Sequence, residues 1–168
     1  MAVTAAAGIY TREQRARRDA SGWTVVQGVL APLQFLVFVV SVLLVANYLL
    51  NDTGYVAAVI SVLIKTLVLL AIMVTGAIWE KVVFGRYLFA HAFFWEDVVS
   101  MLVIALHVGY VLVWVADWMS PREQMLLALA AYGSYVINAA QFLWKFRLAR
   151  RPSSVEIDAA VGMQVAQS

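Results

Sequence analysis

Three acidic residues stand next to large aromatic rings in the middle of this chain. Glu80 follows Trp79, and Glu96 and Asp97 follow the aromatic run at 93–95. A carboxyl group that neighbouring rings keep partly out of water holds its proton more readily, so it can act as a proton donor. A second, ionised carboxylate can position and deprotonate water. The three acids are therefore candidate catalytic groups, although each can also be an ordinary helix-end charge at the lipid headgroups.

Further polar side chains interrupt the apolar segments around these acids. At about 100° per residue, Asn138 and Gln141 share one face of the last segment, while Lys65 and His107 lie near the middle of theirs. Such groups are costly in hydrocarbon and mark a functional site by default. The amides can instead bond neighbouring helices together. Lys65 can pair with a carboxylate or a polar stripe, or be held neutral by burial. His107 can ligate a metal, transfer protons or bond another helix.

The composition indicates whether the chain folds in water or in a membrane. Of 168 residues, 64% are hydrophobic and 13% are charged, with a mean hydropathy of +0.84, which indicates a membrane protein. The absence of cysteine excludes disulfides, zinc–cysteine sites, iron–sulfur clusters and thiol nucleophiles. The basic residues flank apolar segments and are not interleaved with aromatics, so no nucleic-acid partner is expected.

Four segments are long and apolar enough to cross a bilayer, and each should be a helix because backbone groups in lipid must be satisfied within the segment. The sequence therefore predicts an all-α membrane bundle of four transmembrane helices. The predicted spans are Val25–Leu50, Val56–Trp79, Asp97–Ala116 and Met125–Phe146. The predicted organisation is a basic N-terminal tail (1–22), the transmembrane domain (23–148) with an interfacial loop (80–96), and a mobile C-terminal tail (149–168).

Lysine and arginine are distributed unequally around the spans. There are four before the first span, none in the first loop, two in the middle loop, one in the third loop and four around the end of the last span. The positive-inside rule then predicts that both termini and the middle loop are cytoplasmic. Most of the polar and acidic residues fall in the same half of the membrane, so we expect them to converge on one hydrated chamber.

Several segments carry a resemblance to a known family. They resemble the vinyl (bacterio)chlorophyllide hydratase family of bacteriochlorophyll biosynthesis over about residues 11 to 150. The most specific blocks are Trp79-Glu80-Lys81-Val82-Val83-Phe84-Gly85-Arg86-Tyr87 and Phe93-Phe94-Trp95-Glu96-Asp97, supported by Asp19-Ala20-Ser21-Gly22-Trp23-Thr24 and Tyr135-Val136-Ile137-Asn138-Ala139-Ala140-Gln141-Phe142. The resemblance implies a multi-pass enzyme of the bacterial inner (cytoplasmic or intracytoplasmic) membrane. It implies a hydro-lyase that adds water to the C3 vinyl group of a chlorophyllide, giving a 1-hydroxyethyl group.

The resemblance does not identify catalytic residues, so we assign their roles on chemical grounds. Glu80 or Glu96 is expected to be the acid and Asp97 the base, with Asn138 and Gln141 orienting water. The substrate-binding residues are expected to be Lys81 and Arg86 for the propionate, Trp79, Tyr87, Phe93, Phe94 and Trp95 for the ring, and His107 for the central magnesium. That magnesium belongs to the substrate, so no cofactor and no resident metal are expected.

The expected partners are the chlorophyllide, water and membrane lipid, and a homo-oligomer or contact with other pathway enzymes stays open. Two other classes of protein fit the same residues. A non-catalytic tetrapyrrole-binding or assembly subunit would use the aromatics and His107 without chemistry. An ion or proton carrier would use Lys65 and the acids as a relay, but the opposite half of the membrane has few polar groups to complete a path.

Overall fold

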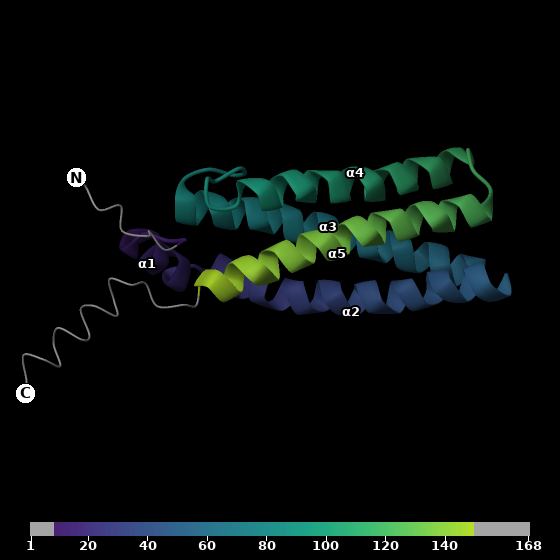
Figure 1. The fold of residues 1–168 in the computed structure, drawn as a ribbon, viewed down its shortest axis with the longest axis horizontal. Coiled ribbons are helices and arrows are strands. Elements are labelled where there is room, and N and C mark those ends of the chain that lie inside the picture. The colour runs from purple at the N-terminus through teal and green to yellow at the C-terminus, as the bar shows by residue number, and fades with distance from the viewer. Residues whose placement is uncertain (1–8, 150–168) are drawn as a thin grey trace, which may run out of the picture.

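The computed structural model describes residues 9–149 of the chain, and the side chains of residues 9–147. This part of the chain forms helices joined by short connections, arranged as an elongated bundle (Figure 1). In chain order the helices are α1 (Arg12–Ala20), α2 (Gly22–Asn51), α3 (Tyr55–Phe84), α4 (Phe94–Ala116) and α5 (Pro121–Ala149).

Four of these helices, α2 to α5, are long and apolar enough to cross a membrane. The predicted all-α bundle of four transmembrane helices is confirmed. Helices α2 and α3 contain 30 residues each, about 45 Å at 1.5 Å per residue, whereas the hydrocarbon core of a bilayer is about 30 Å thick. Their terminal turns therefore extend to the lipid–water interface, which allows charged side chains near the end of α3.

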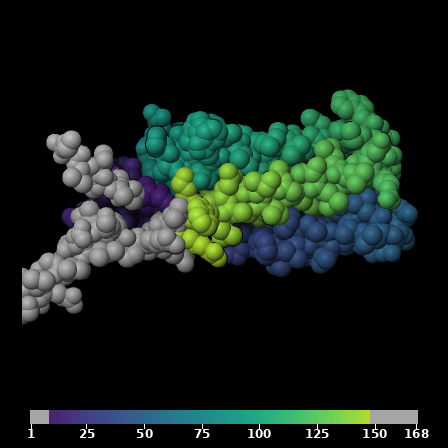
Figure 2. Space-filling model, in the orientation of Figure 1, coloured from purple at the N-terminus to yellow at the C-terminus, as the bar shows by residue number. Residues whose placement is uncertain are grey.

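Tight connections make sequential helices antiparallel neighbours. Asp52 and Gly54 adopt positive φ angles of 52° and 83°, which reverse the chain between α2 and α3. Helix α2 packs mainly on α3, and α4 packs mainly on α5. Helix α5 also contacts α2, and Figure 2 shows it lying between α4 and α2 along one face of the bundle.

The helices extend further than the sequence patterns predicted at the end that carries the acids. The expected interfacial loop 80–96 is shorter, because α3 continues to Phe84 and α4 already begins at Phe94. Glu80 and Glu96 therefore lie on helices. Gly85, with φ 82°, ends α3 in the left-handed conformation that a residue with a side chain rarely adopts.

The predicted N-terminal tail contains an additional helix, α1. Thr11 and Gln14 form a capping box at its start, and Ser21 separates it from α2. Helix α1 contacts α3 and lies at the same end of the bundle as the last turns of α5 (Figure 1). Residues 1–8 of the predicted N-terminal tail and residues 150–168 of the predicted C-terminal tail lie outside the described residues.

Candidate functional site

Two of the predicted acids form a buried pair between α3 and α4. Glu80 and Asp97 are only 5% and 3% exposed. Their carboxyl groups interact with each other, and the N–H groups of the adjacent residues 89 and 90 each bond one of them. Two ionised carboxylates at this separation repel each other. The repulsion is removed when one of them is protonated and donates a hydrogen bond to the other. This acid pair, Glu80 and Asp97, can therefore hold one proton between its two members.

The connection between α3 and α4 folds back over the acid pair. The Phe89 N–H donates to Asp97 Oδ2 at 2.7 Å, and the adjacent Ala90 N–H donates to Glu80 Oε2 at 3.3 Å. Phe89 has a φ of 58°, a left-handed conformation that is uncommon for a bulky residue. Strained backbone of this kind is found mainly where neighbouring structure holds it at a functional site. Here the two N–H bonds to the acids help to hold the left-handed conformation of Phe89.

The helix ends make the two acids electrically unequal. Asp97 lies in the first turn of α4, where unpaired backbone N–H groups favour a negative charge. Glu80 lies about one turn before the end of α3, where the carbonyl groups oppose a negative charge. The shorter bond from the backbone also goes to Asp97. A proton held by the pair is therefore better placed on Glu80, with Asp97 as the anion.

The third predicted acid has a different partner. Lys145 of α5 forms an ion pair with Glu96 Oε2 at 3.0 Å. Asn138 of α5 donates to the Glu96 backbone carbonyl at 2.9 Å and bonds the Ser100 hydroxyl at 3.0 Å. These contacts connect α5 to the first turns of α4, so they fix the position from which Asp97 projects.

The predicted ring-binding aromatics divide into a buried and an exposed set. Trp79 and Phe93 are 9% and 1% exposed and pack against each other and Phe84. Trp79 also donates from Nε1 to Thr24 of α2 at 3.0 Å. Tyr10, just before α1, stacks on Phe84 with ring centroids 5.7 Å apart. We call Tyr10, Trp79, Phe84 and Phe93 the inner aromatic cluster, which closes this end of the bundle.

The remaining predicted aromatics face outward beside the acid pair. Tyr87, Phe94 and Trp95 are 60%, 43% and 69% exposed, and Phe89 is 37% exposed. We call these four rings the outer aromatic surface. The predicted cations are close by: Lys81 lies over the Tyr87 ring at 5.3 Å, and Arg86 precedes Tyr87 in the exposed connection. The predicted ring-binding and propionate-binding groups are thus partly gathered at one surface.

His107, Asn138 and Gln141 are placed differently from one another. His107 is fully buried, ten residues beyond Asp97 on α4, a separation of about 15 Å along the helix axis. It is therefore not beside the acids. The Asn138 amide is engaged with α4, through the Glu96 carbonyl and Ser100. Gln141 is half-buried, and its Oε1 has no hydrogen-bond partner among the described residues, so it remains able to bond water.

Two features of this site have no signal in the sequence. The N–H donors at 89 and 90 depend on the backbone conformation of the connection, which the residue types do not specify. Tyr10 precedes the first span in a polar segment, so no apolar periodicity identifies it as part of the fold. Burial raises the pKa of its hydroxyl, which keeps that group neutral in the inner aromatic cluster.

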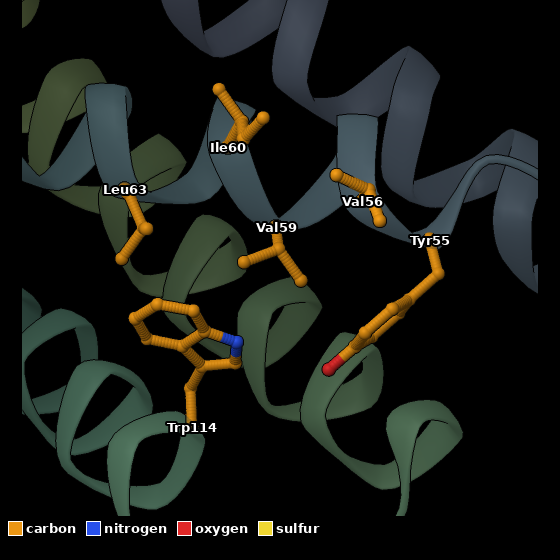
Figure 3. A pocket seen from close by; sticks show the side chains of 6 residues that line it. All are labelled: Tyr55, Val56, Val59, Ile60, Leu63 and Trp114. Atoms are coloured by element: carbon orange, nitrogen blue, oxygen red, sulfur yellow. The ribbon is translucent and has the colours of Figure 1, made fainter.

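An apolar groove lies at the other end of α3, away from the acids (Figure 3). The side chains that line it are Tyr55, Val56, Val59, Ile60, Leu63 and Trp114. Leu63, the lining residue nearest to Glu80 on α3, is 17 residues from it, or about 25 Å along the helix. The structure brings Glu80 together with Asp97, and Glu96 together with Asn138, but this groove is not the hydrated chamber expected beside them.

Comparisons with known proteins agree on one family. Residues 10–148 match the family model described as 2-vinyl bacteriochlorophyllide hydratase. The chain is 62% identical over 149 residues to the 2-vinyl bacteriochlorophyllide hydratase of Rhodobacter capsulatus, covering 88% of this chain and 86% of the relative. It is 65% identical over 143 residues to the protein of the same name from Cereibacter sphaeroides, covering 84% and 88%. No solved structure matches the chain.

Proposed function

The chain belongs to the 2-vinyl bacteriochlorophyllide hydratase family, and we propose that its acid pair hydrates the vinyl group of a chlorophyllide. The resemblance predicted from the sequence is confirmed, and the enzyme is a hydro-lyase of bacteriochlorophyll biosynthesis. We assign the residues that perform the reaction, the surface that holds the substrate and the side of the membrane on which hydration occurs.

The reaction needs one acid and one base. A proton added to the terminal carbon of the C3 vinyl group leaves a cation on the inner carbon, conjugated with the macrocycle. Water attacks that carbon and then loses a proton, which gives the 1-hydroxyethyl product. The sum is addition of one water molecule, with no oxidant, reductant or cofactor. We therefore assign no resident cofactor, and the magnesium of the ring is part of the substrate.

Glu80 is the better proton donor of the two acids considered from the sequence. The Glu96 carboxylate is already engaged in an ion pair with Lys145. Glu80 instead lies against Asp97, at the end of α3 where the helix carbonyl groups disfavour an anion. The proton of the acid pair is therefore placed on Glu80. Asp97, held as an anion by the Phe89 N–H and the start of α4, accepts the proton of the attacking water.

The contact within the acid pair also regenerates the enzyme. After one turnover Glu80 has lost a proton to carbon and Asp97 has gained one from water. Transfer of that proton from Asp97 back to Glu80 across their contact restores the starting state. The cation that forms between these two steps lies next to a carboxylate, which stabilises it most in a site that excludes bulk water. Gln141 Oε1 is free to accept a hydrogen bond from the attacking water.

The macrocycle is proposed to bind at the outer aromatic surface from the lipid side. Its flat apolar faces suit Tyr87, Phe94 and Trp95, which are exposed beside α4. Lys81 and Arg86 are positioned near these rings to bind the propionate. His107 is too deeply buried to ligate the magnesium of a ring held there. The connection at 85–93 covers the acid pair, so the vinyl group has to pass beneath it to reach Glu80.

The enzyme is proposed to act at the inner leaflet of the bacterial inner membrane. The basic residues of α1 and of the last turns of α5 lie at the end of the bundle that carries the acid pair. Because cytoplasmic ends carry the excess of lysine and arginine, this end is assigned to the cytoplasm. The four spanning helices expose apolar side chains that meet lipid.

The observation that supports this mechanism is the contact between Glu80 and Asp97, and its test is replacement of each by its amide. Glu80→Gln and Asp97→Asn should each lower turnover by about 100-fold or more, since a positioned acid or base contributes 10²–10⁴-fold. Glu123→Gln is the control, because Glu123 is an exposed carboxylate at the start of α5. Turnover is measured as the gain of one water mass by the pigment, in membranes with equal amounts of protein. Near-normal turnover in both amide variants would remove the mechanism.

A further inference from the structure

A second set of polar side chains lies in the middle of the bundle and has no role in the acid–base chemistry. Lys65 of α3 and His107 of α4 are both fully buried. They are close enough to influence each other electrostatically. Buried polar groups are normally hydrogen-bonded, and a buried lysine normally has a carboxylate partner. These two side chains therefore need an explanation beyond packing.

Neither side chain is fully satisfied by the protein. Among the described residues, Lys65 Nζ has no hydrogen-bond partner, and it lies 3.7 Å from the centroid of the Tyr135 ring. His107 Nδ1 is 2.8 Å from the carbonyl oxygen of Val103. Because a carbonyl can only accept, Nδ1 must carry the proton. In the neutral ring Nε2 is then an acceptor, and it has no partner among the same residues.

Gln34 of α2 is a third unsatisfied side chain that faces the same interior. It is 2% exposed, and neither its Oε1 nor its Nε2 has a partner in the described part of the chain. It lies midway between two α2 side chains that contact α3. These are Gln27, which donates to Thr75 at 2.7 Å, and Ser41, which bonds Ser61 at 2.7 Å. Gln34 therefore faces the middle of α3.

That register places Gln34 near the other two groups. The midpoint of the two α3 contacts is residue 68, which is three residues, or about 4.5 Å along the axis, from Lys65. Lys65, His107 and Gln34 form what we call the buried polar cluster. In this cluster the lysine offers hydrogen-bond donors, the histidine offers an acceptor, and the glutamine amide offers both.

This combination selects the class of ligand. A metal ion is disfavoured by the lysine ammonium group, and an anion is disfavoured by the free lone pair of His107 Nε2. A small neutral molecule that both donates and accepts matches all three side chains. We propose that the buried polar cluster binds water and supplies it to the acid pair. The supply of water, unlike its binding, rests on the proposed function.

Unsatisfied and polar groups continue from this cluster toward the acids. Ser41 of α2 contacts the Tyr132 hydroxyl of α5, which sets the register of these two helices. Seven residues back from Ser41 is Gln34, and six residues on from Tyr132 is Asn138, so both lie about 10 Å from that contact toward the acid pair. Gln141, with its free Oε1, is one turn further. Water bound at the cluster thus has further polar side chains on the side of the bundle that leads toward the acid pair.

The test combines a structure with kinetics of the full-length protein in lipid nanodiscs. A wild-type map that resolves solvent should contain a peak within hydrogen-bonding distance of both Lys65 Nζ and His107 Nε2. Gln34→Leu and Lys65→Met should each lower kcat about tenfold with KM for the vinyl substrate unchanged, as expected when one hydrogen bond that orders water is lost. The loss should deepen when sorbitol lowers the water activity.

The control is Tyr110→Phe, which removes another unpartnered buried hydroxyl one turn beyond His107, on the side away from the acids. It should keep the wild-type kcat. Lys65→Met should not lower the unfolding temperature, because a buried ammonium group without a carboxylate partner is itself costly. A purely structural lysine would not separate stability from turnover in this way. A resolved interior without the solvent peak overturns water binding, and normal kcat in both variants overturns water supply. Full turnover by Glu80→Gln, with the peak and the kcat loss present, would overturn only the acid assignment.

Discussion

Single backbone and side-chain contacts decide which carboxylate can do which chemistry. Glu80, Glu96 and Asp97 have similar sequence surroundings, yet the structure gives each a different partner. Glu96 forms an ion pair with a lysine. Asp97 accepts a backbone N–H bond at the start of a helix, and Glu80 lies next to another carboxyl group. A carboxyl group is therefore suited to an ion pair, or in the proposed mechanism to the role of base or proton donor, according to what it touches.

This difference predicts that Glu96 is dispensable for the chemical step. Glu96→Gln should keep turnover within about tenfold of wild type, because the amide oxygen can still accept the bond from Lys145 and the bond from Asn138 to the backbone carbonyl of residue 96 remains. Glu80→Gln, measured in the same membranes, should lose far more. Pigment mass and protein amount are determined together. A loss in Glu96→Gln equal to that in Glu80→Gln would show that the acid was assigned to the wrong residue.

Helices and connections determine what the substrate can contact. The inner aromatic cluster ties the segment before α1 to the end of α3, through rings such as Tyr10 and Phe84. The connection at 85–93 and the first turn of α4 together carry the outer aromatic surface. Rings that look equivalent in sequence thus serve two purposes, because α3 and α4 bury one set and expose the other.

The outer aromatic surface should control affinity and leave the chemical step unchanged. Trp95→Ala and Tyr87→Ala are each expected to raise KM for the vinyl substrate about two- to tenfold, since a well-placed aromatic pair contributes about 0.5–1.5 kcal/mol beyond its area. The unfolding temperature should not change, because both rings are exposed.

The matched control is Trp118→Ala, because this tryptophan is 77% exposed at the opposite end of the bundle. Its KM and kcat should equal those of the wild type. If the two site variants bind the substrate normally, or if the control variant weakens binding equally, the macrocycle does not rest on this surface.

The sequence predicted the elements well and the contacts within the site only in part. Apolar length identifies the spans, and the polar side chains that interrupt them identify inward faces, because membrane helices have one geometry and a polar group in lipid is costly. Helix α1 was missed, since its capping box is a local signal in a segment without apolar periodicity. The expected contact of His107 with the magnesium rested on the ligand chemistry of imidazole alone, and ten residues of helix separate His107 from Asp97. The bonds from residues 89 and 90 depend on a backbone conformation that no residue pattern encodes.

The two ends of the bundle differ, because the acid pair lies at only one of them. The acid pair, α1 and the last turns of α5 share an end, whereas the turns at 52–54 and 117–120 form the other (Figure 1). A substrate that partitions into one leaflet can reach only one of these ends. The orientation of the bundle therefore decides the leaflet in which the reaction occurs.

The orientation can be measured directly because the natural chain has no cysteine. His91→Cys places a thiol in the exposed connection over the acid pair, and Ser120→Cys places one in the exposed turn at the opposite end. A membrane-impermeant maleimide should label His91→Cys only from the cytoplasmic side and Ser120→Cys only from the other side. The reverse labelling pattern would place the site at the outer leaflet.

Proton exchange between Glu80 and Asp97 is tested most sharply by comparing the double variant Glu80→Gln/Asp97→Asn with its two single variants. Residues that act as one proton-transfer unit have strongly non-additive effects on turnover. We expect the double variant to lose about as much turnover as the worse single variant, roughly 100-fold or more. A double variant whose loss is the product of the two single losses would contradict this mechanism, because the two carboxyl groups would then act independently.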